Sequence, residues 1–531
     1  MTNDSAIVEA IAAERTWLGI EFGSTRIKAC LIGPEYEVVA AGSHDWENQF
    51  VDGVWTYSLE AIWAGLQDAV GSLLADCDER RGARPTSVGA LGVSAMMHGY
   101  LAFDEAGELL VPFRTWRNTS TGQAAAELSE RFGFNIPLRW SVAHYYQAIL
   151  DDEPHVPKVA FLTTLAGYVH WRLTGRRVLG IGDASGMFPV DSTTGTYDES
   201  MLARFDELAA ARQPGRRLVE LLPQVLAAGE VAGSLTDEGA ALLDPGNTLR
   251  PGISLCPPEG DAGTGMVATN AVAPRTGNVS VGTSIFAMVA LEKPLTNVHH
   301  EIDVVATPAG GPVAMVHCNN GFSEIDAWAG LLGEFSAGLG HAAAKDEVFA
   351  ILFRASLEGE ADGGGLLAYN YLSGEPITGL DAGRPLVVRT PDSQLTLANF
   401  ARSQIYGAFG TLSVGMQVLT AEGVRLDAMV AHGGVFRTAG VAQRLLAAAI
   451  GAPVAVGATA GEGGAWGMAL LAAYVGAGEE KSLADFLAMR VFADAETTVV
   501  EPDPADVSGY AAFLDRYRAG LAIERAAITA L

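Results

Sequence analysis

Apolar residues along the chain occur both in short runs and at the spacing of a helix face. Runs at 17–22 and 27–32 flank a polar segment at 23–26 (Gly-Ser-Thr-Arg), which predicts a hairpin of two strands. Residues 59–74 have apolar positions at helical spacing, and another short apolar run follows at 88–93. Strands that alternate with helices in this way predict an α/β fold.

The remaining patterns extend this alternation to the C-terminus. They predict further helices at 161–173, 396–419, 441–450 and 507–521 and a strand at 428–431. Gly451 follows one of these helices, at the position where a left-handed C-cap is favoured. Pro453 and Gly457 interrupt the long apolar tract at 445–478, so we expect it to form buried core and no transmembrane helix.

Two segments of the chain are built alike. Residues 18–25 are Leu-Gly-Ile-Glu-Phe-Gly-Ser-Thr, and residues 278–284 are Asn-Val-Ser-Val-Gly-Thr-Ser. In each segment a strand ends at a glycine, two hydroxyl residues follow, and a second apolar strand begins. Gly23 and Gly282 lie about half a chain length apart, far more than the period of a solenoid, which predicts two halves of similar construction.

Each glycine turn by itself is explained as an ordinary hairpin turn, which favours glycine and hydroxyl residues. The matched context of the two turns favours a second interpretation, a paired site for phosphate groups. Glycine allows the backbone to approach a phosphate closely, and hydroxyl groups add hydrogen-bond donors. A further pair, Gly433-Gly434, follows the predicted strand at 428–431 and precedes a helix, an arrangement that suits a ribose or a base.

The composition narrows the classes of partner. The 531 residues include 34 Lys and Arg and 62 Asp and Glu, which gives a net charge of −28. A surface this acidic argues against binding to nucleic acid or to anionic membranes. A single nucleotide is still compatible with it, because backbone N–H groups and a metal can hold a small polyphosphate.

The cysteines and the N-terminus indicate the compartment. Four cysteines without a Cys-x-x-Cys pair predict reduced thiols, with neither a disulfide framework nor a zinc site. Asp4 and Glu9 occupy an N-terminus where an export signal would have basic and then apolar residues. We therefore expect a cytoplasmic protein.

Asp261 is the candidate catalytic base. It lies in the glycine-rich segment 257–265 between the two predicted hairpins, where a carboxylate between two domains can accept a hydroxyl proton during phosphoryl transfer. A turn-forming role would explain the same residue. The chain has no Gly-x4-Gly-Lys-Ser/Thr motif, which excludes a P-loop enzyme, and no Gly-x-Gly-x-x-Gly in strand context, which disfavours a Rossmann dehydrogenase.

Several motifs, in order along nearly the whole chain, resemble the FGGY carbohydrate-kinase family within the actin and sugar-kinase fold. They lie at residues 19–25, 94–99, 165–175, 260–262, 281–284, 371–375 and 432–435. The resemblance implies an α/β protein of two ribonuclease-H-like domains around a central cleft, with a sugar-binding domain at 15–268 and an ATP-binding domain at 269–531. It also implies that Mg²⁺, ATP and a small sugar are the ligands.

The resemblance assigns roles to individual positions of this sequence. Asp261 matches the catalytic base of the family. The phosphate and adenosine turns match Gly23, Ser24, Thr25, Gly282, Thr283, Ser284, Gly433 and Gly434. The sugar contacts match Met97, His98, Gly99, Trp116, Asn118 and Asp261, and Asp183 lies in a segment near the same side. Glu21 and Asp261 match the positions that hold hydrated Mg²⁺ through water.

Within the family, Met97-His98-Gly99 makes the chain most similar to xylulokinases, which implies conversion of D-xylulose to D-xylulose 5-phosphate. Glu21 stands where the family usually has Asp, and Asn118 stands where xylulokinases usually have an acidic residue. The alternatives are a kinase for L-ribulose, another polyol or a sugar acid such as gluconate, an actin-like or chaperone-like ATPase, and an inactive sugar sensor. A homodimer is also compatible with the resemblance.

Overall fold

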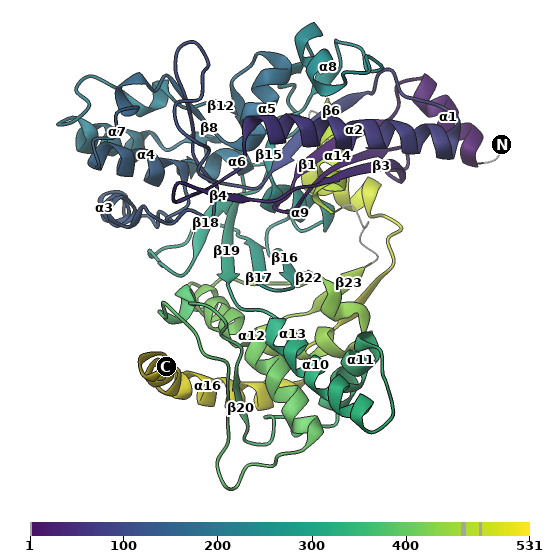
Figure 1. The fold of residues 1–531 in the computed structure, drawn as a ribbon, viewed down its shortest axis with the longest axis vertical. Coiled ribbons are helices and arrows are strands. Elements are labelled where there is room, and N and C mark those ends of the chain that lie inside the picture. The colour runs from purple at the N-terminus through teal and green to yellow at the C-terminus, as the bar shows by residue number, and fades with distance from the viewer. Residues whose placement is uncertain (1–2, 458–462, 477–480) are drawn as a thin grey trace. The chain divides into compact units, whose positions relative to one another are not determined.

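The computed structural model describes residues 3–457, 463–476 and 481–531, and these residues form two compact units (Figure 1). Unit 1 comprises Met1–Ala273, Val304–Val313 and Thr459–Asp494. Unit 2 comprises Pro274–Asp303, Ala314–Ala458 and Ala495–Leu531. Both units combine a mixed sheet with helices, which confirms the α/β class.

The main sheet of unit 1 has the order β13-β14-β6-β1-β2-β3, and β15 also pairs with β6. Its strands are β1 Trp17–Phe22, β2 Arg26–Ile32, β3 Val38–Asp45, β6 Ala90–Ala95, β13 Gly233–Ser234, β14 Ser254–Leu255 and β15 Glu259–Gly260. The strand β1 is antiparallel to β2 and parallel to β6. The predicted hairpin of 17–22 and 27–32 is therefore confirmed.

The helices of unit 1 are α1 Asn3–Ala12, α2 Leu59–Arg81, α3 Gly122–Phe132, α4 Ser141–Leu150, α5 Leu165–Thr174, α6 Ile181–Ser185, α7 Glu199–Ala209, α8 Asp237–Leu243, α9 Asp261–Ala268, α14 Gly464–Tyr474 and α15 Leu483–Phe486. Its short strand pairs are β4 Gln49–Val51 with β5 Val54–Thr56, β7 Leu101–Phe103 with β8 Phe161–Thr163, β9 Val178–Gly180 with β12 Gln224–Leu226, and β10 Val190–Asp191 with β11 Thr196–Tyr197. Two glycines let helices pack directly on the sheet. A Cβ on Gly19 would overlap the backbone of α14, and one on Gly42 would overlap that of α2.

A second sheet, whose strands β16, β17, β22, β23 and β24 belong to unit 2, repeats this arrangement. Its order is β18-β19-β17-β16-β22-β23-β24. The strands are β16 Thr276–Val281, β17 Ile285–Ala290, β18 Asp303–Ala306, β19 Pro312–Cys318, β22 Ala428–His432, β23 Val454–Gly457 and β24 Thr497–Val500. The strand β16 is antiparallel to β17 and parallel to β22, just as β1 is antiparallel to β2 and parallel to β6. The prediction of two similarly built halves is confirmed at the level of these strands.

The helices of unit 2 are α10 Ser323–Gly338, α11 Lys345–Ser356, α12 Leu397–Ala421, α13 Val441–Ile450 and α16 Pro504–Ala530, and β20 Leu367–Tyr369 pairs with β21 Leu386–Val388. The predicted helices at 396–419, 441–450 and 507–521 are confirmed, and Gly451 has the expected left-handed C-cap with φ of 66°. The prediction of one helix over 161–173 is wrong in its first part. Residues 161–163 form β8, and the Thr164 side chain then caps α5 by accepting a hydrogen bond from the Gly167 N–H.

The apolar tract at 445–478 forms the end of α13, then β23, then α14. Residues 458–462 and 477–478 of this tract lie outside the described residues. Across the parts of the chain that the structure describes, no helix is both long enough and apolar enough to cross a membrane. The four cysteines are buried thiols.

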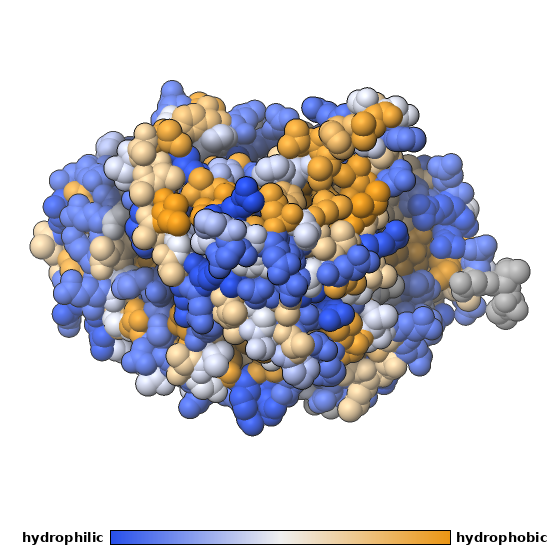
Figure 2. Space-filling model, turned by 90° about the horizontal axis from the view of Figure 1, so that it is seen from below, coloured by the Kyte–Doolittle hydropathy of each residue, from blue (hydrophilic) through white to orange (hydrophobic). Residues whose placement is uncertain are grey.

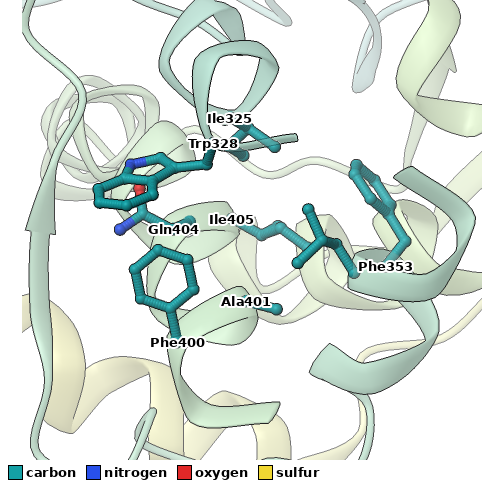
Figure 3. Close-up of a pocket in the computed structure, with 8 residues that line it drawn as sticks. Ile325, Trp328, Phe353, Phe400, Ala401, Gln404 and Ile405 are labelled. Atoms are coloured by element: carbon teal, nitrogen blue, oxygen red, sulfur yellow. The ribbon is translucent and has the colours of Figure 1, made fainter. Parts of the chain in front are cut away.

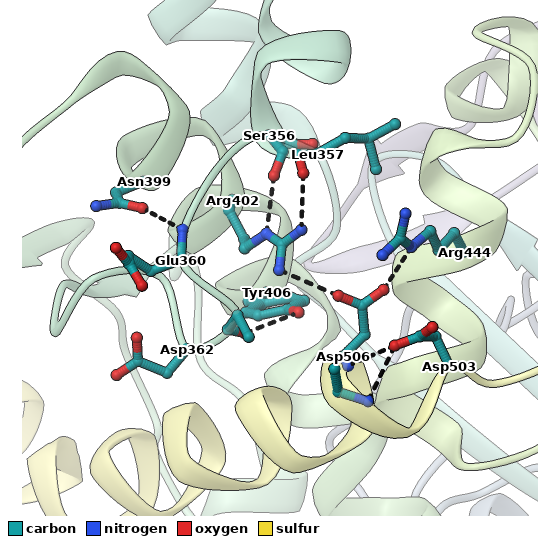
Figure 4. A network of polar contacts seen from close by, with 12 residues as sticks. Ser356, Leu357, Glu360, Asp362, Asn399, Arg402, Tyr406, Arg444, Asp503 and Asp506 are labelled. Atoms are coloured by element: carbon teal, nitrogen blue, oxygen red, sulfur yellow. Dashed lines mark hydrogen bonds and ion pairs between the residues drawn. The ribbon is translucent and has the colours of Figure 1, made fainter.

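A buried ion pair joins three helices of unit 2 (Figure 4). The guanidinium of Arg402 on α12 donates to a carboxylate oxygen of Asp506 on α16 at 3.2 Å and to the carbonyl oxygen of Ser356 at 2.8 Å. Arg444 on α13 donates to the other oxygen of Asp506. The Arg402 and Asp506 side chains are 2% and 4% exposed, so removal of either partner would leave a buried charge.

Some large apolar side chains of unit 2 remain exposed. Leu331 and Phe335 lie on one face of α10, and Leu339 follows the end of this helix at the same spacing of four residues; each of the three is more than half exposed. Figure 2 shows one face of the molecule, on which apolar residues gather in patches among hydrophilic ones. Single exposed apolar residues are common on protein surfaces, whereas a row of three along one helix and its C-cap is less common.

Candidate active site

Three parallel strands of unit 1 end side by side and bring distant residues to one sheet edge. Glu21 in β1 pairs with Ser94 in β6, and Ser94 pairs with Glu259 in β15. The loop that begins at Met97 follows β6, and Asp261 directly follows β15. The register therefore places Glu21, the Met97 loop and Asp261 at the same edge, which spacing in the sequence alone does not reveal.

Asp261 is the first residue of α9, where the sequence had suggested a glycine-rich loop. Its Oδ1 accepts hydrogen bonds from the backbone N–H groups of Met97 at 3.1 Å and Ala262 at 3.0 Å. Burial raises the pKa of its carboxyl group, while these N–H groups and then the charge of Arg139 act in the opposite direction. The N–H groups fix the orientation of the carboxylate, and both bind the same oxygen.

Two further carboxylates lie near Asp261. The carboxylate of Glu259 accepts hydrogen bonds from the N–H groups of Gly182 at 3.3 Å and Asp183 at 3.0 Å, at the start of α6. A Cβ on Gly180 or Gly182 would overlap the Glu259 carboxylate, so these glycines make room for it. The sequence analysis missed Glu259. Its position just before Gly260-Asp261 was visible, but its burial was not.

Asp183 completes this acidic cluster. Its Oδ2 accepts a hydrogen bond from the Thr164 hydroxyl at 2.6 Å, and its Oδ1 has no hydrogen-bond partner among the described residues. Asp183 and Glu259 are each 1% exposed. Burial, together with the nearby carboxylates, raises the pKa of Asp183 to about 7 and that of Glu259 to about 8. The pKa values of Asp183 and Glu259 are therefore raised into the neutral range.

The Met97-His98-Gly99 segment forms a sharp turn after β6. His98 and Gly99 both have left-handed backbones, with φ of 72° and 91°. The Nδ1 atom of His98 lies 3.2 Å from the Gly186 carbonyl oxygen, and because a carbonyl oxygen can only accept, Nδ1 carries the proton. The ring also stacks on Trp140. The position of His98 is thus fixed by contacts on two sides.

Trp116 and Asn118 lie in a segment that packs against β5. The Asn118 side chain accepts a hydrogen bond from the Trp55 N–H at 2.9 Å and donates to the carbonyl oxygens of Trp55 at 2.8 Å and Thr115 at 2.9 Å. These bonds engage the whole amide group and give Asn118 a structural role. Its contact with substrate stays a prediction. Trp116 is half-buried against the core of unit 1, and the Arg117 guanidinium stacks over it.

The first glycine turn directs its carbonyl groups into unit 1. The carbonyl oxygens of Gly23 and Ser24 accept hydrogen bonds from the Trp46 indole N–H at 2.8 Å and the Tyr57 hydroxyl at 2.6 Å. Ser24 and Thr25 are exposed. The Gly23 N–H donates to the Arg26 carbonyl oxygen within the hairpin, so the donors that the turn can offer to an anion are the N–H and hydroxyl groups of Ser24 and Thr25.

The carbonyl groups of the second glycine turn, at 282–284, are also engaged by the protein, but by backbone N–H groups. The carbonyl oxygens of Gly282 and Thr283 accept hydrogen bonds from the backbone N–H groups of Phe322 at 2.8 Å and Gly321 at 2.7 Å. Gly282 and Thr283 are exposed. Gly433 lies beside this turn, because a Cβ on Gly433 would overlap the Val281 carbonyl oxygen at the end of β16. The register of β16 and β22 therefore brings 282–284 and 433–434 to one edge of the sheet of unit 2.

Glu21 and Asp261, which were predicted to hold magnesium through water, offer carboxylate oxygens of the kind that this ion binds. A Cβ on Gly464 would overlap a Glu21 carboxylate oxygen and lie 3.0 Å from the Thr264 hydroxyl, so the Glu21 side chain lies near Thr264 of α9, three residues along the chain from Asp261. Mg²⁺ typically takes one or two carboxylates and completes its shell with water and phosphate oxygens. Within the described residues, no three or more His, Cys, Asp or Glu side chains are grouped to hold a metal ion.

A separate apolar hollow lies in unit 2 (Figure 3). It is lined by Ile325, Trp328, Leu352, Phe353, Phe400, Ala401, Gln404 and Ile405. None of the candidate site residues predicted from the sequence lies in its wall.

Fold and site define an α/β protein of two similar units, each presenting a glycine and hydroxyl turn where its central strand ends. Residues 16–246 match the N-terminal domain of the FGGY family of carbohydrate kinases, and residues 277–476 match the C-terminal domain of that family. The chain belongs to the FGGY family of carbohydrate kinases.

The individual relatives share only a low sequence identity with this chain. A xylulose kinase of Streptomyces coelicolor is 29% identical over 180 residues, which is 32% of this chain and only about a third of that relative (34%). The solved structure of a xylulose kinase from Rhodospirillum rubrum has a TM-score of 0.76 at 20% identity and covers 96% of this chain and 99% of its own. A gluconate kinase from Lactobacillus acidophilus has a TM-score of 0.76 at 19% identity, with coverages of 94% and 96%. At such identities the solved structures support the fold alone.

Proposed function

We propose that this protein is an ATP-dependent sugar kinase and that D-xylulose is its substrate, with D-xylulose 5-phosphate as the product. The observation that carries the proposal is the position of Asp261 at the sheet edge of unit 1, with its carboxylate oriented by two N–H groups. Family membership and the xylulose kinases among its relatives support the reaction and the sugar.

In this proposal Asp261 accepts the proton of the sugar hydroxyl at Oδ2 while Oδ1 stays bonded to Met97 and Ala262. Met97, His98, Gly99 and Trp116 would contact the sugar. His98 can hold a fixed orientation toward it because its ring is bonded to Gly186 and stacked on Trp140.

The two glycine turns, 23–25 and 282–284, would bind phosphate oxygens with their N–H and hydroxyl donors, and Gly433 and Gly434 would adjoin the adenosine. Glu21 and Asp261 would hold Mg²⁺ through water. Bound Mg·ATP would supply the phosphoryl group, with the metal neutralising charge on the phosphates.

Release of ADP from purified protein, measured across a panel of pentuloses, polyols and sugar acids, tests the proposal. We expect the highest kcat/KM with D-xylulose and a loss of about 10²- to 10⁴-fold in Asp261→Asn. Near-normal turnover in that variant would remove Asp261 from its role. Preference for gluconate or L-ribulose would replace the sugar but leave the reaction class intact.

A second readout separates the kinase from the ATPase alternative. A kinase releases little ADP without sugar, whereas an actin-like or chaperone-like ATPase releases ADP at the same rate whether or not sugar is present. The homodimer stays a prediction, which sedimentation velocity of the purified chain would check.

A further inference from the structure

A chain of buried polar contacts leads to the glycine turn at 282–284, which lies in unit 2. Its members are Asn320, Asn370 and Glu375, which we call the Asn320 network. Their side chains are 4%, 4% and 0% exposed. Buried amide and carboxyl groups are costly unless they are hydrogen-bonded, so a cluster of three in one place calls for an explanation.

Glu375 anchors the network. Its Oε2 accepts hydrogen bonds from the backbone N–H of Asn320 at 3.3 Å and from the Asn320 side-chain amide at 3.2 Å. The Asn320 side-chain oxygen in turn accepts from the N–H groups of Leu372 at 2.9 Å and Ser373 at 3.0 Å. Asn320 is therefore held from both sides by the segment that follows β20.

Asn370 connects the network to the residues that contact the turn. Its side-chain amide donates to the carbonyl oxygens of Asn320 at 3.0 Å and Gly321 at 2.6 Å. The N–H groups of Gly321 and Phe322 then donate to the carbonyl oxygens of Thr283 and Gly282. The network thus lies one residue away from the groups that fix the turn.

Only glycine fits at position 321 in this arrangement. A Cβ at this position would overlap the Gly282 carbonyl oxygen and approach that of Thr283 at 2.9 Å. Because the backbone of Gly321 approaches the turn so closely, a small shift of the segment 319–322 would move the turn with it.

The first turn offers an internal comparison. There, the side chains of Trp46 and Tyr57 bind the turn carbonyl groups directly. The second turn is bound by two backbone N–H groups of a loop, and a loop needs contacts of its own to keep its N–H groups in place. The Asn320 network supplies these contacts.

We propose that Asn320, Asn370 and Glu375 are positioning residues for the turn at 282–284, which keep its N–H and hydroxyl groups arranged for the phosphates of a nucleotide. The inference rests on the proposed function. It goes further in naming three buried residues, separate from those assigned to the nucleotide, that set the affinity for ATP and not that for sugar.

The hydrogen-bond pattern defines graded variants. Asn370→Ala removes both donations to the 320–321 backbone, and Asn370→Ser is a milder form for use if the alanine variant does not fold. Glu375→Ala removes the anchor. Glu375→Gln can keep an oxygen at the Oε2 position, because both donors from Asn320 bind that one atom. The Gln variant should therefore rescue what the Ala variant loses.

Tyr371→Phe is the matched control. Tyr371 lies in the same segment, next to Asn370, but its hydroxyl bonds to Thr378, Thr411 and Tyr517 and to no member of the network. Loss of that hydroxyl perturbs the buried core of unit 2 without a direct effect on the turn.

Steady-state kinetics and nucleotide binding test the proposal. We expect Asn370→Ala and Glu375→Ala to raise KM for ATP and Kd for ADP, measured by calorimetry, about tenfold, with KM for sugar changed less than twofold. Tenfold corresponds to about 1.4 kcal/mol. In ligand-free protein, hydrogen exchange of a peptide that contains 282–284 should become faster in both variants and stay normal in Glu375→Gln and Tyr371→Phe.

The opposite outcomes would overturn the proposal. They are an unchanged Kd for ADP with unchanged exchange at 282–284, an equal rise of both KM values, or a Tyr371→Phe variant that matches Asn370→Ala. If the wild-type protein phosphorylates no sugar, the proposed function fails, but ADP affinity and hydrogen exchange still decide the role of the network.

Discussion

Replacement of Asp183 by Asn should make the stability of unit 1 less sensitive to pH. The Asp183 side chain is 1% exposed, with one oxygen bonded to the Thr164 hydroxyl and the other without a partner among the described residues. Asn can keep an oxygen toward Thr164 and removes the ionisable group. The variant therefore isolates the cost of a buried charge next to Glu259 and Asp261.

The magnitude follows from the raised pKa of Asp183, about 7 against an ordinary value of 3.8. Between these two values the folded protein holds a proton that the unfolded chain has lost, so stability falls as pH rises, by about 1.4 kcal/mol per pH unit. From pH 5 to pH 7 the wild-type protein should lose about 2 kcal/mol through this group, and the loss should level off at about 3 kcal/mol above pH 7. The amide side chain of the Asp183→Asn variant has no such dependence.

Urea unfolding followed by tryptophan fluorescence at pH 5, 6, 7 and 8 measures the effect. Trp328 is in unit 2 and the other eight of the nine tryptophans belong to unit 1, so the signal reports mainly on unit 1. The introduced amide leaves a buried N–H group without an acceptor, which lowers stability by a similar amount at every pH. We therefore expect the free energy of unfolding of Asp183→Asn, relative to wild type, to rise by about 3 kcal/mol between pH 5 and pH 8.

Asp244→Asn is the control. Asp244 is also a buried Asp of unit 1, but its oxygens accept hydrogen bonds from the N–H groups of Gly246, Thr248 and Leu249. An amide in its place loses acceptors, so this variant should be destabilised at pH 8. The reasoning is refuted if Asp183→Asn differs from wild type by the same amount at pH 5 and pH 8.

Three further predictions concern the site and the core. Glu21→Gln should raise the Mg²⁺ concentration required for half-maximal activity several-fold with little change in KM for sugar, as a magnesium titration of ADP release would measure. Asp506→Ala should lower the free energy of unfolding by about 3–5 kcal/mol, because it leaves Arg402 buried without its partner. Arg516→Ala, which breaks a half-exposed pair with Asp362, should cost less than about 1 kcal/mol in the same urea titration.

Local pattern was enough to predict the elements nearest the site. The hairpin around Gly23, the strand before Gly433 and the helix that ends at Gly451 all have strong signals, because apolar periodicity and glycine conformation act over a few residues. The helix predicted over 161–173 failed at its start. An apolar run of three residues is equally compatible with a strand, and pairing of β8 with β7 decided the outcome.

The burial of the acidic cluster could not be predicted from the sequence. Glu259 and Asp183 look like surface carboxylates in a chain with 62 Asp and Glu, and only packing places both in the interior beside Gly180 and Gly182. The Asn320 network was missed for the same reason. Asn320 follows β19, whereas Asn370 and Glu375 follow β20, and hydrogen bonds between these two segments exist only after β19 and β20 have been placed.

The sequence by itself determined the α/β class, the two hairpins with their glycine and hydroxyl turns, and the family. These features depend on short-range patterns of residues, which can be recognised without knowledge of the fold. Only the tertiary structure decided that Val304–Val313 and Thr459–Asp494 join unit 1, where Ala306 donates to Ser185 and Trp466 donates to Tyr36. It also decided which carboxylates are buried and which groups hold the turns, because those contacts join residues far apart in the chain.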